Sequence, residues 1–104
     1  MEEYKIEISA KAKLDMLEIH TYIAVNFKEQ SIANRFLDKI ESAILTLKIM
    51  PLRHNIDRDE QLKHRRLRKL LVDNYLIFYT VNEKIKSVFI VRVLYARRDW
   101  LNLL

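Results

Sequence analysis

The sequence contains no glycine, no cysteine and only one proline among its 104 residues. Without glycine, the chain lacks a glycine-rich phosphate loop, a Rossmann fingerprint and a P-loop, because each needs backbone conformations that other residues disfavour. Without cysteine, it has no disulfide, no thiolate metal site and no cysteine nucleophile. These absences exclude nucleotide chemistry by the usual motifs, and they exclude thiol chemistry.

Long apolar runs are also absent. No stretch of about 18 apolar residues occurs, which argues against a membrane-spanning helix. The segment from Met1 to Lys5 has no apolar secretion signal, so we expect a cytoplasmic protein. Hydrophobic residues make up 50% of the chain, which is too many for a disordered tail. At this length we expect one domain over residues 1–104.

Hydrophobic periodicity predicts a strand followed by two helices. Residues 4–9 alternate between apolar and polar, as in a half-buried strand, and Ser9 can cap the helix after it. Ser31 is a candidate cap for a second helix, which Pro51 would end. The short link predicts an antiparallel helical hairpin. Two apolar stripes mark the helices: Ala12, Met16, Ile19, Ile23 and Phe27, then Ala33, Phe36, Leu37, Ile40, Ala43, Ile44 and Leu47.

The second half of the chain predicts three strands. After a polar loop at 52–61, strands are expected at 66–72, 75–81 and 87–95, with one closing helical turn within 97–104. The last strand is almost continuously apolar, which predicts burial on both faces. The predicted fold is α+β with the order β-α-α-β-β-β, in which the N-terminal helical hairpin packs on an antiparallel sheet. Four aromatic residues are expected in the sheet core: Tyr75, Phe78, Tyr79 and Phe89.

Positive charge is concentrated in one short segment. The chain has 19 basic and 14 acidic residues, a net charge of +5. Segment 61–72 holds basic residues and no acidic one, and the remainder of the chain is balanced. Such a patch favours an anionic partner, with a solvated edge strand as the alternative. The basic residues of the segment are Lys63, Arg65, Arg66, Arg68 and Lys69.

No metal or nucleophile signature is present. His20, His54 and His64 lack the spacing of a zinc pair, and the acidic segment 57–60 lacks the glycine and distal glutamate of a calcium loop. We expect His20 to be partly buried or on the surface. The serines occupy capping, helical-surface or strand-start positions. The sequence therefore predicts no metal and no other cofactor.

Basic residues interleaved with aromatic ones form the remaining candidate site. The C-terminal part adds Arg92, Tyr95, Arg97, Arg98 and Trp100 to the basic segment. If the last strand is central, both groups could line one face of the sheet. Cations there could neutralise phosphates and stabilise a phosphorane, which a metal-free RNase needs together with a base and an acid.

Two segments resemble the RelE/ParE superfamily of toxins from type II toxin–antitoxin modules, often called plasmid stabilisation systems. They are residues 74–81, Asn-Tyr-Leu-Ile-Phe-Tyr-Thr-Val, and residues 89–100, Phe-Ile-Val-Arg-Val-Leu-Tyr-Ala-Arg-Arg-Asp-Trp. Similar residues at 33–36 and at Met50-Pro51 extend the resemblance to nearly the whole chain. It implies the same fold, a growth-arresting toxin and a cognate antitoxin that binds the basic and aromatic residues. Homo-oligomers and toxin–antitoxin hetero-oligomers are both compatible with it.

The resemblance implies one of two mechanisms. The RelE-like branch cleaves mRNA on the ribosome, and Arg68, Lys69 and Arg98 fall at or near its basic catalytic positions. However, Leu76 stands where that branch commonly has arginine, and no histidine follows the last strand. The ParE-like branch inhibits DNA gyrase, and it is similar in its long helical hairpin and in the Arg98-Asp99 ending. We therefore favour a gyrase inhibitor, with an mRNA interferase second and a non-toxic nucleic-acid or protein-binding relative third.

Overall fold

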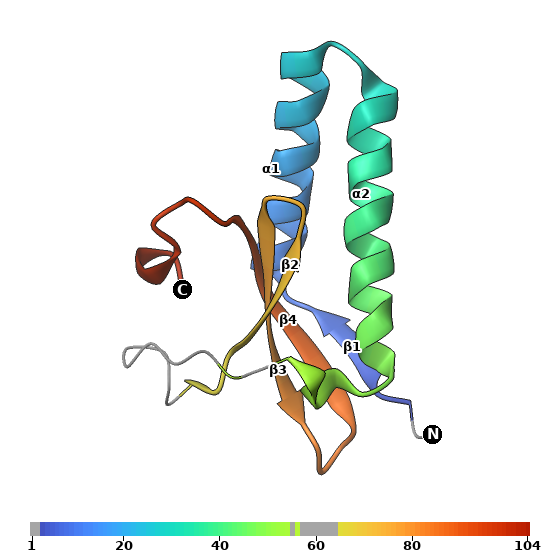
Figure 1. Cartoon of the computed structure of the whole chain (residues 1–104), viewed down its shortest axis with the longest axis vertical. Coiled ribbons are helices and arrows are strands. Elements are labelled where there is room, and N and C mark those ends of the chain that lie inside the picture. The colour runs from blue at the N-terminus through green and yellow to red at the C-terminus, as the bar shows by residue number, and fades with distance from the viewer. Residues whose placement is uncertain (1–2, 55, 57–64) are drawn as a thin grey trace.

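The computed structural model describes residues 3–54, 56 and 65–104. Two long helices and four strands make up most of the chain (Figure 1). Short 3₁₀ turns lie at Thr46–Lys48 (η1), Pro51–Arg53 (η2) and Trp100–Asn102 (η4). The predicted order β-α-α-β-β-β is confirmed. The main elements are β1 (Lys5–Ile8), α1 (Ala10–Phe27), α2 (Gln30–Leu45), β2 (Arg68–Val72), β3 (Tyr75–Asn82) and β4 (Ser87–Tyr95).

The four strands form one open sheet with the order β1-β4-β3-β2. Strands β2, β3 and β4 form the predicted antiparallel meander, and β1 pairs parallel to β4, so the sheet is mixed. The helical hairpin lies on one face and extends beyond the end of the sheet (Figure 1). Phe78 pairs with Arg92 but Tyr79 pairs with Ile90, which leaves Val91 as an extra residue in β4. This β-bulge bends the strand at its middle.

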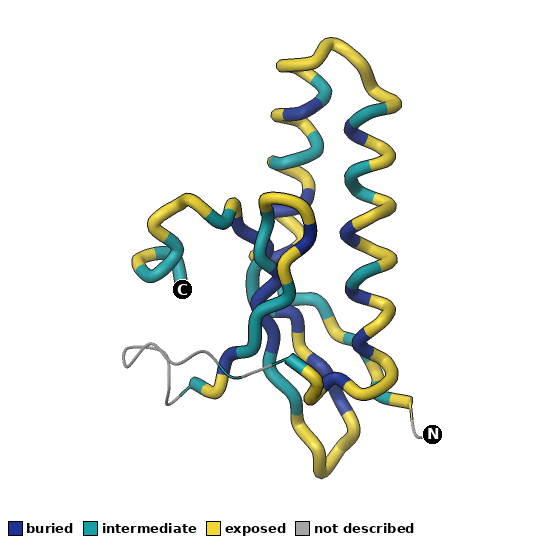
Figure 2. Tube along the Cα trace, in the orientation of Figure 1, coloured by how far each residue is buried: buried dark blue, intermediate teal, exposed yellow. Residues whose placement is uncertain are grey.

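The main core lies between the helical hairpin and the sheet (Figure 2). Ile40 of α2 and Leu47 of η1 are fully buried, which confirms the predicted second stripe. Tyr79 of β3 is also fully buried and donates a hydrogen bond to the Pro51 carbonyl at 2.8 Å. Its ring supplies apolar contact while its hydroxyl keeps a partner, which is how a buried tyrosine avoids an unpaired polar group.

The prediction for the helix ends is confirmed at Ser9 and is wrong at Ser31 and Pro51. The Ser9 hydroxyl accepts from the Ala12 N–H at 2.9 Å, so the predicted cap is confirmed. Ser31 is not a cap: Glu29 occupies that position, and the Ser31 hydroxyl donates to the Glu29 carboxylate. Nor does Pro51 end α2, because the helix has already ended at Leu45 and tightened into η1.

Several predicted strand and helix residues lie outside the core. Strand β2 begins at Arg68 rather than residue 66, because Arg66 has a left-handed φ of 54°. Phe89 is 41% exposed, so β4 is not buried on both faces along its whole length. Phe27 is 62% exposed because the end of α1 projects past the sheet. Of the predicted loop at 52–61, residues 52 and 53 belong to η2, and 55 and 57–61 lie outside the described residues.

Candidate functional site

The sheet face opposite the helical hairpin carries a second apolar cluster beneath the C-terminal turn. Leu67, Phe78 and Leu94 are buried in it. The Trp100 ring lies 5.2 Å from the Phe78 ring between centroids. The C-terminal turn therefore covers this part of the sheet, which we call the outer face. Partly buried side chains complete the cluster: Leu76, Val91, Leu101, Leu103 and Leu104.

Three predicted cations hold the C-terminal turn on the outer face. Arg65 donates to the Leu104 carbonyl at 2.7 Å, and Arg92 donates to the Leu103 carbonyl at 2.7 Å. The Lys69 ammonium lies 5.0 Å from the centroid of the Trp100 ring, within cation–π range. These side chains satisfy carbonyl groups and an aromatic ring of the chain itself.

Arg92 also forms a largely buried ion pair with Asp15 of α1. Its Nε and Nη2 donate to the two carboxylate oxygens at 2.7 and 2.8 Å. The hydrogen bond to Asp15 is the main cause that raises the pKa of Arg92 above its usual value. A bidentate pair of this kind fixes orientation as well as charge. The Arg92 guanidinium is therefore engaged within the chain, by Asp15 and by the Leu103 carbonyl. Nothing in the local sequence indicates Asp15 as its partner.

The three catalytic candidates from the sequence do not converge. In the β2–β3 register Arg68 lies opposite Tyr79 and Lys69 lies opposite Phe78, so their side chains are on different faces of the sheet. The Arg68 guanidinium donates to the His54 carbonyl, beside η2. Arg98 is exposed after the end of β4, whereas Lys69 contacts the C-terminal turn.

A groove of about 750 Å³ lies beside the C-terminal end of β4 and contains predicted residues Tyr95 and Arg98. The Tyr75 ring is 5.6 Å from Tyr95 and 4.8 Å from Phe36. Burial, followed by proximity to Tyr22 and Tyr95, raises the pKa of Tyr75. The groove is thus lined by aromatic side chains, one arginine and three acidic residues, Asp15, Glu18 and Asp73. Predicted residues Arg66 and Arg97 are exposed, and Lys63 lies outside the described residues.

His54 lies in a polar site that the sequence analysis did not anticipate. There His54 was weighed only as a possible metal ligand. Its Nε2 is buried and has no hydrogen-bond partner among the described residues, and its ring lies edge-on to the Tyr79 ring, with 6.3 Å between the centroids. Burial is the main cause that lowers the pKa of His54, and Arg53 and Arg68 lower it further. Burial raises the pKa of Tyr79 to about 12. Only the fold brings these residues together, since residues 53–54, 68 and 79 are distant in sequence.

Two further findings bear on the site. Within residues 3–54, 56 and 65–104, no group of three histidine, cysteine, aspartate or glutamate side chains could hold a metal ion. In the same part of the chain, no helix is long and apolar enough to cross a membrane. His20 is half-buried, as expected, with its Nε2 2.8 Å from the Asn34 side-chain oxygen on the neighbouring helix.

Comparison with known proteins identifies the family. Residues 6–100 match the profile described as "ParE toxin of type II toxin-antitoxin system, parDE". The chain belongs to the ParE toxin family. A search of curated proteins gives no match. The RelE/ParE resemblance seen in the sequence is therefore confirmed.

Solved structures support the same fold. A chain of the chromosomal ParDE system from P. aeruginosa superposes with a TM-score of 0.74 at 14% identity, covering 91% of this chain and 98% of that one. A chain of the toxin–antitoxin complex RelBE2 from Mycobacterium tuberculosis superposes with a TM-score of 0.64 at 21% identity, covering 91% and 93%. The ParE-type toxin described here therefore has the RelE/ParE fold.

Proposed function

We propose that this ParE-type toxin arrests bacterial growth by inhibiting DNA gyrase, and that a cognate antitoxin neutralises it. The observation that supports the proposal most is that the C-terminal turn covers the outer face of the sheet. Trp100 packs on Phe78, and the C-terminal carbonyls are held by Arg65 and Arg92. A cation that holds the fold in this way is a poor candidate for binding a phosphate. The exposed C-terminal arginines, Arg97 and Arg98, are better placed to contact a large partner.

The mRNA-cleaving alternative needs groups that the described residues of the outer face do not supply. A metal-free RNase requires a general base, a general acid and cations around the developing phosphorane. Leu76 packs in the outer apolar cluster, at a position where the cleaving branch commonly has arginine. The two described histidines lie elsewhere, His20 on α1 and His54 after η2. The described residues of the outer face thus favour a binding surface over a nuclease site.

The antitoxin part of the proposal is supported by the relatives. The two solved structures compared above come from toxin–antitoxin systems, ParDE and RelBE2. The exposed Arg66, Arg97 and Arg98 offer positive charge to an acidic partner segment. Such a segment would fold on binding and bury apolar surface next to these arginines.

Purified components test the proposal. The toxin is added to gyrase-catalysed supercoiling and, in parallel, to ribosomes translating a defined mRNA. We expect loss of supercoiling and intact mRNA. Arg98→Glu should weaken the inhibition, whereas Lys84→Glu in the exposed β3–β4 turn makes the same charge change and should not. Supercoiling that proceeds normally while mRNA is cut within codons would favour the nuclease, and inactivity in both assays would favour a non-toxic relative.

A further inference from the structure

Residues 49–52, which we call the η1–η2 turn, display three apolar side chains on the surface. Ile49, Met50 and Leu52 are 41%, 59% and 40% exposed. Met50 has a left-handed backbone, with φ of 54° and ψ of 52°, which is uncommon for a residue other than glycine. Strained positions of this kind persist only where neighbouring contacts enforce them, and they are concentrated at binding and active sites. The conformation of Met50 therefore requires a specific restraint.

Arg53 supplies that restraint. Its Nη1 donates to the carbonyls of Ile49 and Thr46 at 2.8 and 3.1 Å, and its Nη2 donates to the Thr46 hydroxyl at 2.7 Å. The backbone N–H of Arg53 also donates to the Met50 carbonyl at 3.2 Å. These acceptors are all neutral, and an arginine stays protonated in proteins. The guanidinium thus fixes the η1–η2 turn while it keeps its positive charge.

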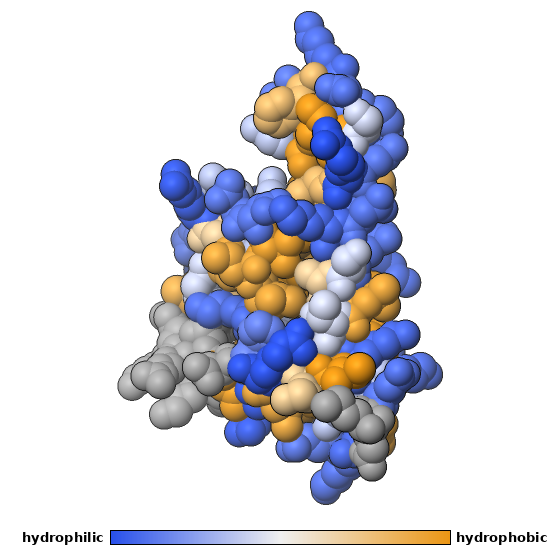
Figure 3. Space-filling view, turned by 45° about the vertical axis from the view of Figure 1, so that its right-hand side comes forward, coloured by the Kyte–Doolittle hydropathy of each residue, from blue (hydrophilic) through white to orange (hydrophobic). Residues whose placement is uncertain are grey.

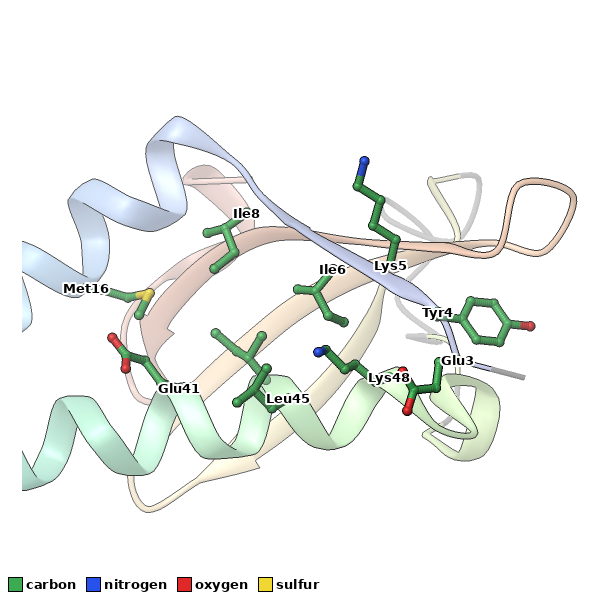
Figure 4. Close-up of a pocket in the computed structure, with 10 residues that line it drawn as sticks. Glu3, Tyr4, Lys5, Ile6, Ile8, Met16, Glu41, Leu45 and Lys48 are labelled. Carbon is green, nitrogen blue, oxygen red and sulfur yellow. The ribbon is translucent and has the colours of Figure 1, made fainter. Parts of the chain in front are cut away.

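A groove of about 480 Å³ lies beside the η1–η2 turn and is lined by its three apolar side chains. Among the described residues, its charged lining consists of Arg53 and Lys86, with no acidic side chain. Lys86 lies over the Tyr4 ring, 5.3 Å from its centroid. This ring points away from Ile6, which faces the neighbouring groove between β1 and α2 (Figure 4). Apolar surface is visible among charged residues toward this lower end of the molecule (Figure 3).

The charge and the shape of the groove select one kind of partner. Its apolar side chains can bury apolar side chains of a segment, and its two cations favour acidic residues on that segment. A concave groove receives side chains, whereas a membrane surface binds side chains that project from the protein. A DNA-binding enzyme such as gyrase carries basic surface where it holds DNA. The antitoxin, which is expected to bring an acidic segment that folds on binding, therefore fits the groove better than the target.

We infer that an acidic, apolar segment of the cognate antitoxin docks against the η1–η2 turn and inserts apolar side chains into this groove. Met50 and Leu52 supply apolar contact, and Arg53 and Lys86 supply charge. The turn loses little freedom on binding, because Arg53 already fixes it. This contact adds to the one proposed at the exposed arginines. The inference rests on the antitoxin part of the proposed function and is independent of the action on gyrase.

Titration calorimetry of the toxin with its full-length antitoxin tests the apolar contact. Met50→Asn removes the apolar side chain, and asparagine tolerates a left-handed backbone, so the turn should keep its shape. We expect the Kd for the antitoxin to rise about tenfold. Val25→Asn is the matched control, since Val25 is 67% exposed near the end of α1, and it should leave the Kd unchanged. Thermal unfolding verifies that both variants are folded.

The same titration tests the charge. Lys86→Glu places an acidic side chain in the groove and should raise the Kd about tenfold, because it repels the acidic segment. Lys84→Glu makes the same charge change two residues away in the exposed β3–β4 turn, outside the groove lining, and should leave the Kd unchanged.

Four results would overturn the inference. If the antitoxin binds Met50→Asn and Lys86→Glu as tightly as the original chain, this groove is not its site, although the antitoxin remains a partner. If both control variants weaken binding equally, the effect is not specific to the groove. If the original chain does not bind the antitoxin, the antitoxin part of the proposed function fails as well. If the groove variants keep their affinity but no longer inhibit gyrase, the groove belongs to the target.

Discussion

The carboxylate of Asp15 pairs with the Arg92 guanidinium and also accepts a hydrogen bond from the Val93 N–H at 3.0 Å. Strand β1 pairs with β4 only as far as Ile8, so the edge of β4 is open beyond that point. The Ser9 hydroxyl and the Asp15 carboxylate satisfy backbone groups of β4 where the strand pairing ends. Beyond Ile8, side chains from the start of α1 thus replace β1 as hydrogen-bond partners of the β4 backbone.

Removal of Asp15 should be strongly destabilising. Asp15→Ala leaves the Arg92 charge without its partner and the Val93 N–H without its acceptor. The side chains of Arg92 and Asp15 are only 15% and 8% exposed, so water replaces the lost contacts poorly. We expect the free energy of unfolding to fall by about 3 to 5 kcal/mol, measured by urea denaturation. Lys11→Ala, on the exposed side of the same helix, should cost under about 0.5 kcal/mol. Similar losses at both positions would contradict the assigned ion pair.

Leu47 should be a major contributor to the main core. It is fully buried between the helical layer and the sheet, so Leu47→Ala loses apolar burial and leaves a cavity. The expected cost is about 2 to 5 kcal/mol. Glu41→Ala changes an exposed residue of α2 and should alter stability by under about 0.5 kcal/mol. Thermal or urea unfolding compares the two, and equal costs would mean that the buried face is assigned wrongly.

Stability should depend on pH through His54. Its pKa is lowered in the folded protein by burial and by Arg53 and Arg68, so the unfolded chain binds the proton more readily. The stability that neutral His54 contributes is therefore fully present above about pH 6.5, the pKa of an unfolded histidine. It is lost as the pH falls below that value. We expect the free energy of unfolding to decrease between about pH 7.5 and 5.5, and His54→Phe to reduce that slope. An unchanged slope in the variant would exclude His54 as the group responsible.

Association with the antitoxin should be fast at low salt and slower at moderate salt. Arg66, Arg97 and Arg98 are exposed, and their charge would attract an acidic segment over a distance that salt screens. Stopped-flow measurements at increasing ionic strength would show a falling association rate constant. Arg66→Glu should lower that constant, whereas Lys84→Glu should have a smaller effect. A rate constant that does not respond to salt would mean that the basic residues are not the docking site.

The sequence predicted the elements well because their apolar patterns are local. The stripe containing Ile40 and Leu47 and the alternation around Ile6 were each visible within a few residues, and the fold bears them out. The family resemblance rested on segments of this same kind and agrees with the matched residues 6–100.

The site was less predictable because its contacts join distant parts of the chain. Nothing near Arg92 in sequence indicates Asp15, and nothing near His54 indicates Tyr79. The turn geometry was also unpredictable, because glycine usually indicates a left-handed backbone position and this chain has none. Other residue types occupy the left-handed positions instead. These positions are Lys28, Met50, Arg66, Asp73 and Lys86.

Expression of this toxin without its antitoxin, followed by identification of the damaged molecule, tests the central claim most directly. Growth arrest alone does not distinguish the mechanisms, because a gyrase inhibitor and an mRNA interferase both cause it. Covalent gyrase–DNA complexes are recovered and quantified, and mRNA ends are mapped in the same cells. We predict trapped gyrase–DNA complexes and a DNA-damage response with mRNA intact. Codon-specific mRNA cleavage without trapped gyrase would contradict the account and would make Arg68, Lys69 and Arg98 the residues to test as catalytic.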